Sequence, residues 1–127
     1  MAEGRLRGDD PVRVVTGSPG VRRDFTDVRC VARAYRLLGS GAPAGVYNVC
    51  SGHTPSIADI VALLGEVARV RVEHVVDPAL VRPHEVQEIR GAHVRLTEAT
   101  GWEPEIPFAR TLGDAVDWWE GQLRAAA

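Results

Sequence analysis

The stretch that decides the fold is residues 12–38, VRVVTGSPGVRRDFTDVRCVARAYRLL. Its first five residues alternate and are rich in β-branched types, which predicts a strand over 12–16. Gly17, Pro19 and Gly20 then interrupt the pattern with a loop. From Asp27 onward, apolar residues recur at the spacing of an amphipathic helix. The expected inward face of this helix consists of Val28, Val31, Ala32, Tyr35 and Leu38.

The rest of the chain continues this alternation of element types. The pattern predicts further strands over 46–50 and 70–76, and helices over 57–68, over 93–100 and from 111 onward. Ser56 is expected to cap the second helix, with Asp59 three residues later, and Gly101 to end the third. The order predicts one α/β domain over 1–127, with a small, partly parallel sheet and flanking helices. The last helix is expected to turn Leu112, Ala115, Val116, Trp119 and Leu123 inward.

Length and composition bound the function. A chain of 127 residues, 45% hydrophobic and 25% charged, suits a globular domain with one core. A net charge of −2 does not suggest affinity for nucleic acid. The apolar runs are much shorter than the roughly 20 residues that a membrane-spanning helix needs. The first residues lack the apolar region of a secretion signal, so the expected location is the cytoplasm. Cys30 and Cys50 fit apolar patterns and are expected to be small buried residues.

The basic residues exclude several kinds of chemistry. All 15 of them are arginine, so the chain offers no Schiff-base lysine, no P-loop lysine and no tyrosine–lysine relay. Gly39, Gly41 and Gly45 follow a predicted helix instead of a strand, and their spacing differs from that of a dinucleotide-binding loop. We therefore expect no NAD(P) site in this chain. The four histidines are scattered without the spacing of metal ligands.

Two arginine segments are the candidate binding residues. Arg23 lies in the loop after the first strand, and Arg82 lies in an aperiodic segment three residues before Glu85. A guanidinium binds phosphate oxygens through two parallel hydrogen bonds, and a carboxylate accepts hydrogen bonds from vicinal hydroxyls, so these three suit a nucleoside diphosphate. The alternative is that Arg23 pairs with Asp24 or Asp27 and that Arg82 pairs with Glu85 on the surface. Spacing alone favours these surface ion pairs.

Four segments occur in an order that resembles a known family: residues 23–28 (RDFTDV), 46–52 (VYNVCSG), 82–86 (RPHEV) and 101–106 (GWEPEI). Together they resemble the C-terminal portion of the extended short-chain dehydrogenases/reductases, the nucleotide-sugar epimerases and dehydratases. Within that family the likeness is to the GDP-mannose dehydratases and the GDP-4-keto-6-deoxymannose reductases. It covers nearly the whole chain, from about residue 12 to 123. Cys30 departs from the pattern, because the family commonly has aspartate there.

The resemblance implies a division of labour. In the family, an N-terminal Rossmann part carries the NAD(P) loop and a Ser/Thr–Tyr–Lys catalytic set, and the C-terminal lobe binds the nucleotide sugar. Carried over, Arg23 and Arg82 match the two arginines that contact the diphosphate, and Glu85 matches the carboxylate on the ribose. This form of the RPHEV segment, with glutamate in fourth position, favours a GDP-linked ligand.

Three hypotheses follow. The chain could be a substrate-binding lobe that is inactive alone and works with a Rossmann-domain subunit. It could be a non-catalytic remnant that acts as an interaction domain. Alternatively, it could be part of a complete NAD(P)-dependent enzyme whose upstream residues are absent from this sequence. Loss of a Rossmann neighbour is expected to expose an apolar face and to favour self-association.

Overall fold

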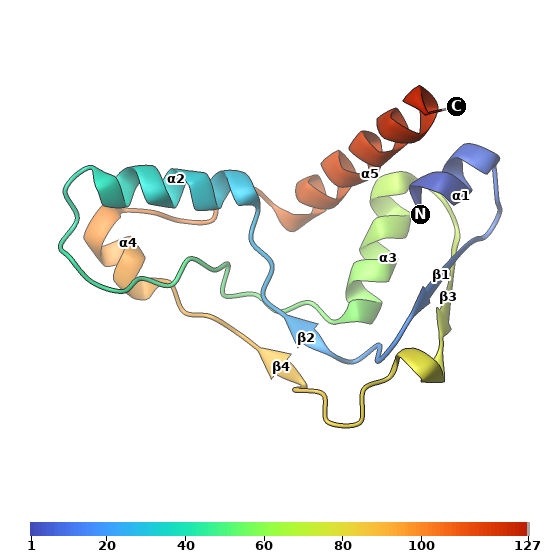
Figure 1. Cartoon of the computed structure of the whole chain (residues 1–127), viewed down its shortest axis with the longest axis horizontal. Helices are drawn as coiled ribbons and strands as arrows, with labels where there is room; N and C mark the ends of the chain where they lie inside the picture. Colours follow the sequence, from blue (N-terminus) through green and yellow to red (C-terminus); the bar gives the residue numbers. More distant parts are fainter. Residues whose placement is uncertain (127) are drawn as a thin grey trace.

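A computed structural model describes residues 1–126 of the chain (Figure 1). In chain order the helices and strands are α1 (Ala2–Arg7), β1 (Val12–Thr16), β2 (Arg22–Arg23), α2 (Val28–Gly39), α3 (Ile57–Ala68), β3 (Val72–Val76), the 3-10 helix η1 (Pro78–Leu80), β4 (Glu88–Ile89), α4 (Val94–Thr100) and α5 (Phe108–Ala125).

Two small parallel sheets form the β structure. β1 pairs with β3 in the register Val12↔Val72 to Thr16↔Val76, which confirms both expected strands. β2 pairs with β4, so that Arg22 lies opposite Glu88. Among residues 1–126, the antiparallel pairing is a single isolated bridge between Arg22 and Ser56. The expected α/β class with a small, parallel sheet is therefore confirmed.

The expected strand over 46–50 is wrong. The segment adopts no regular structure, and no strand pairs with it in the part of the chain that the structure describes. Tyr47 and Val49 pack against the core formed by α2 and α4, whereas Val46 is 81% exposed. The apolar run thus reflects partial burial of side chains without the backbone pairing that defines a strand.

Local signals at the ends of helices are confirmed. The Ser56 hydroxyl accepts a hydrogen bond from the Asp59 backbone amide (3.1 Å), and the Asp59 carboxylate accepts one from the Ser56 amide (2.9 Å). This capping box begins α3, which packs against β3 and α5. Gly101 ends α4 in a left-handed conformation with φ of 68°. The sequence pattern gave no indication of α1, which packs against α5.

The core between α2 and α4 differs from the expected one. It consists of Cys30, Ala34, Leu96 and Trp102. The Trp102 ring nitrogen donates to the Cys30 carbonyl oxygen at 2.9 Å within this core. The expectation that Val28 and Tyr35 face inward is wrong, because they are 75% and 68% exposed. The helix is rotated so that small residues, which permit close packing against Trp102, face α4.

The inward face of α5 also differs in part. The helix begins at Phe108, three residues before the expected start, and its buried residues are Val116 and Glu120. Arg5 from α1 lies 3.0 Å from the buried Glu120 carboxylate, which explains how a charged residue is accommodated there. Trp119 was expected inside but is 56% exposed and contacts Trp118 edge to face. None of the helices in residues 1–126 is long and apolar enough to cross a membrane.

Candidate functional site

The three predicted binding residues lie on β2 and in the segment that leads into β4. Arg23 ends β2 and is half-buried. Arg82 and Glu85 lie in the segment that joins η1 to β4. This segment returns to β2, because the Arg22 amide donates a hydrogen bond to the Gln87 carbonyl oxygen at 2.8 Å (Figure 1). The topology thus brings the segments together, although no hydrogen bond or ion pair joins the three side chains within residues 1–126.

The expected surface ion pairs do not form. The Arg23 guanidinium donates to the Arg22 carbonyl oxygen at 2.7 Å and has no carboxylate partner among the described residues. Asp24 and Asp27, which could have neutralised it, are engaged elsewhere. Arg82 is exposed and makes no ion pair with Glu85. Both predicted phosphate-binding arginines therefore keep charge that the chain itself does not neutralise.

Asp24 links β2 to two distant segments. One carboxylate oxygen accepts hydrogen bonds from the Ser51 amide (2.8 Å) and hydroxyl (2.7 Å), and the other accepts from the Gly52 amide (2.9 Å) and the Gly91 amide (3.2 Å). Burial alone would raise the pKa of this carboxyl, but the hydrogen bonds from Ser51, Gly91 and Gly52 outweigh burial and lower it. Asp24 is therefore ionised at neutral pH, and its carboxylate joins the end of β2 to the segments around Ser51 and Gly91.

Asp27 plays a similar part between two helices. It caps α2 by accepting the Arg29 amide hydrogen bond at 2.8 Å, and it also accepts from the Arg29 guanidinium and from the Thr111 hydroxyl of α5 (2.7 Å). The hydrogen bonds from the Arg29 side chain, which outweigh burial, hold the pKa of the Asp27 carboxyl well below its usual range. Asp114 contacts the same guanidinium at 2.7 Å.

Glu85 has unused hydrogen-bonding capacity. Its side chain is half-buried, and its Oε2 atom is inaccessible to solvent with no hydrogen-bond partner in residues 1–126. A buried carboxylate oxygen without a donor is unfavourable by about 1–3 kcal/mol or more. Because solvent does not reach this oxygen, a ligand hydroxyl could donate to it only if the Glu85 side chain moved.

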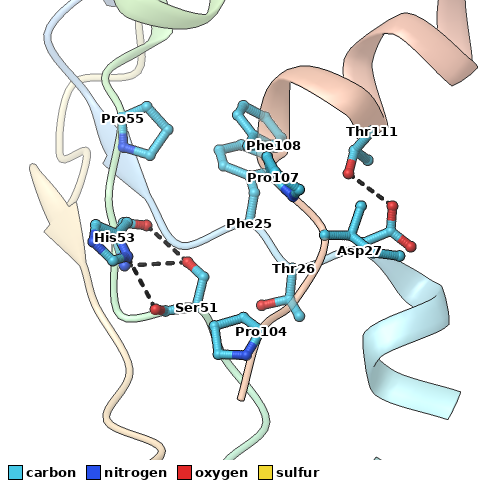
Figure 2. A pocket seen from close by; sticks show the side chains of 11 residues that line it. Phe25, Thr26, Asp27, Ser51, His53, Pro55, Pro104, Pro107, Phe108 and Thr111 are labelled. Atoms are coloured by element: carbon cyan, nitrogen blue, oxygen red, sulfur yellow. Dashed lines mark hydrogen bonds between the residues drawn. The ribbon is translucent and has the colours of Figure 1, made fainter. Parts of the chain in front are cut away.

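A cavity of about 390 Å³ begins just after β2 in the chain, at Phe25 (Figure 2). Its walls are mainly apolar, and the Phe25 and Phe108 rings stack there with centroids 5.2 Å apart. The Asp27–Thr111 hydrogen bond lies on one wall. The predicted binding residues do not line the cavity, but Phe25 follows Arg23 by two residues. The full lining is Phe25, Thr26, Asp27, Ser51, His53, Pro55, Pro104, Ile106, Pro107, Phe108 and Thr111.

Sequence reasoning missed this cavity and the role of Asp24. The cavity joins residues from three distant segments, and the signal that could have indicated it is the group of prolines at 104 and 107 after a tryptophan. Ser51, His53 and Asp24 do not form a catalytic relay. The His53 Nδ1 atom contacts the Ser51 carbonyl oxygen at 3.1 Å, whereas the Ser51 hydroxyl donates to Asp24.

The sequence was compared with protein-family models and with known proteins. No family model matches it. It is 43% identical over 113 residues to the GDP-6-deoxy-D-mannose reductase of Pseudomonas aeruginosa, a match that covers 88% of this chain and 37% of that protein. The structure superimposes on RMD from Pseudomonas aeruginosa complexed with NADPH with a TM-score of 0.84 and 38% identity, over 95% of this chain and 39% of the other.

The chain fits the C-terminal portion of the extended short-chain dehydrogenase/reductase family. A second solved structure agrees. The UDP-glucose 4-epimerase of Thermotoga maritima, determined with UDP-glucose, aligns with a TM-score of 0.79 and 26% identity, over 96% of this chain and 38% of its own length. The chain spans less than two-fifths of each of these relatives, so it matches a part of nucleotide-sugar reductases and epimerases.

Proposed function

We propose that this chain, over residues 1–127, is the substrate-binding lobe of a nucleotide-sugar reductase, dehydratase or epimerase. The lobe binds the nucleoside diphosphate and does not catalyse the reaction by itself. The observation that carries the proposal is the state of the two arginines. Arg23 and Arg82 have no carboxylate partner in the described residues, although acidic residues lie close to both in sequence. Two guanidinium groups without a carboxylate partner, one on β2 and one in the segment before β4, suit a diphosphate.

Each of the three residues has a distinct role in this proposal. Arg23 and Arg82 donate to oxygens of the diphosphate, where the planar guanidinium can form two parallel hydrogen bonds. Glu85 accepts from the ribose hydroxyls, as the resemblance of the RPHEV segment implies. GDP is the favoured diphosphate because the relative with 43% identity is a GDP-6-deoxy-D-mannose reductase.

The redox cofactor belongs to a partner in this proposal. The relative from Pseudomonas aeruginosa was determined with NADPH, and NAD(P) serves such relatives. In this chain, however, Gly39, Gly41 and Gly45 follow α2 and lead into an irregular segment, so their amides do not open a helix toward a pyrophosphate. The residues present do not fit a dinucleotide, and we assign that role to a Rossmann-type subunit.

The sheet topology supports such a partner. β1 pairs with β3 alone within residues 1–126, which leaves backbone groups along its other edge without a strand. Parallel sheets are normally larger and covered on both faces. A Rossmann-type subunit in the cytoplasm, or a second copy of this chain, is the proposed partner at this edge.

Calorimetric titration tests the binding proposal. We expect GDP to bind, and we expect Arg82→Ala to weaken binding by about 1.5–3 kcal/mol, the scale of a charge-assisted hydrogen bond. Arg36→Ala is the matched control, because Arg36 is an exposed arginine on α2, remote in sequence from the sheet. Equal affinity of the Arg82→Ala protein and the unmodified chain would remove Arg82 from the site.

A second candidate function is a protein-interaction module without ligand binding. Exposed apolar side chains favour it, notably Val28 and Tyr35 on α2 and the Trp118–Trp119 pair on α5. The same titration separates the two. Absence of binding for GDP, GDP-mannose and UDP-glucose at millimolar concentration would favour the interaction module.

A further inference from the structure

The Asp24 carboxylate organises the surroundings of Arg23 without neutralising it. Its four acceptor positions are filled by Ser51, Gly52 and Gly91, which lie 27, 28 and 67 residues away in sequence. Arg23 is the next residue in the chain, yet its guanidinium turns away to the Arg22 carbonyl oxygen. A negative charge one residue from a binding arginine is thus stabilised by amide and hydroxyl donors from elsewhere.

Two glycines make this arrangement possible. The Gly91 amide reaches Asp24 because the chain there passes directly over Cys50, where a Cβ atom at position 91 would overlap the Cys50 Sγ atom. Gly52 adopts φ of 77°, a backbone conformation that favours glycine. The close approach of both segments to one carboxylate is therefore a specific feature of the backbone and not an incidental surface contact.

The strand that carries Arg23 needs such an anchor. β2 has two residues, and its backbone is held to the β4 side by hydrogen bonds from the Arg22 amide to Gln87 (2.8 Å) and from the Asp24 amide to Ile89 (3.1 Å). On the opposite side Arg22 is bridged to Ser56, and the Asp24 side chain adds hydrogen bonds from Ser51 and Gly52 at the end of the strand. Arg23 lies between these two attachments, so its backbone direction depends on Asp24.

We propose that Asp24 is a positioning residue for the diphosphate site: its carboxylate fixes the backbone from which Arg23 projects, and it affects ligand affinity through Arg23. The inference rests on the proposed function. Asn at this position has nearly the same shape but replaces one acceptor oxygen with an NH₂ group, which would face the amide donors of Gly52 or Gly91. The β2 strand would then lose side-chain hydrogen bonds that hold its end, while the backbone bridge between Arg22 and Ser56 remains.

A double-mutant cycle on the full chain, with GDP as the probe, tests the inference. We expect Asp24→Asn to weaken GDP binding at least tenfold in the unmodified chain and less than twofold in the Arg23→Ala background. Asp9→Asn is the control, because the Asp9 carboxylate also accepts two hydrogen bonds, from the Arg7 guanidinium, but lies between α1 and β1. It should leave GDP affinity unchanged.

Ser51→Ala provides a milder variant in case Asp24→Asn fails to fold. It removes one donor to the Asp24 carboxylate and should weaken GDP binding two- to fivefold, again only when Arg23 is present. Equal weakening in both backgrounds would indicate a general structural role and overturn the inference, as would unchanged affinity in Asp24→Asn. No GDP binding by the unmodified chain would instead refute the proposed function, and this inference with it.

Discussion

At the scale of single residues, Asp27 joins the start of α2 to α5. Its buried carboxylate caps α2, pairs with Arg29 and accepts a hydrogen bond from Thr111 in α5. Removing these contacts leaves the α2 N-terminus without its cap and the Arg29 guanidinium with Asp114 as its carboxylate partner. We expect Asp27→Ala to lower the free energy of unfolding by about 2–4 kcal/mol. Urea denaturation at pH 7 measures this, with Asp117→Ala on the exposed face of α5 as control.

The same residue predicts a dependence of stability on pH. Hydrogen bonds from Arg29 lower the pKa of Asp27 in the folded state, whereas the unfolded value is about 3.9. A lowered carboxyl pKa contributes stability above the unfolded value, and that contribution declines as the pH falls toward the folded value. The stability difference between the unmodified chain and Asp27→Asn should therefore be largest at neutral pH and smaller at pH 3. A constant difference between pH 7 and pH 3 would contradict this assignment.

At the scale of elements, Arg69 offers a test of helix termination. It ends α3 with φ of 55°. Among residues 1–126 it is the only non-glycine residue with a positive φ. Glycine adopts this left-handed conformation without the steric cost that a Cβ atom imposes. We expect Arg69→Gly to raise the free energy of unfolding by about 0.5–1 kcal/mol. Arg36→Gly, within α2, should lower it by about 1 kcal/mol, so a stabilising effect of both changes would show that helix termination is not the cause.

The elements also show how far sequence alone reaches. The strand over 12–16, the capping box at Ser56 and the glycine that ends α4 depend on neighbouring residues, and all three were predicted. The inward face of α2 was not, because burial depends on the partner helix. Val28 and Tyr35 fit the helical period as well as Cys30 and Ala34 do, and only the position of Trp102 decides between them.

In the candidate site too, features that depend on neighbouring residues are predictable from the sequence, and features that depend on distant segments are not. Arg23, Arg82 and Glu85 stand out in the sequence as residue types suited to a nucleotide, and the short strands that bring their segments together were not foreseen. Asp24 looked like a surface partner for Arg23. Its role depends on donors from Ser51 and Gly91, which no local pattern relates to it.

At the scale of the whole molecule, the open edge of β1 predicts association. Val15 on β1 is 45% exposed beside backbone groups that no strand pairs within the described residues. We expect the sedimentation coefficient of the isolated chain to rise with concentration. A lysine on an edge strand opposes strand pairing, so Val15→Lys should suppress the rise. Tyr35→Lys, which alters an exposed apolar residue on α2, should not, and equal suppression by both would indicate a nonspecific apolar contact.

The central claim concerns the whole chain as a lobe that binds a nucleoside diphosphate. The most direct measurement is a calorimetric titration of the unmodified chain with GDP and, separately, with guanosine, at low ionic strength where charge contacts are least screened. In the proposed function Arg23 and Arg82 contact the diphosphate, so we predict that GDP binds measurably and that guanosine binds much more weakly. Equal affinity for the two compounds, or no binding of GDP at millimolar concentration, would contradict the account.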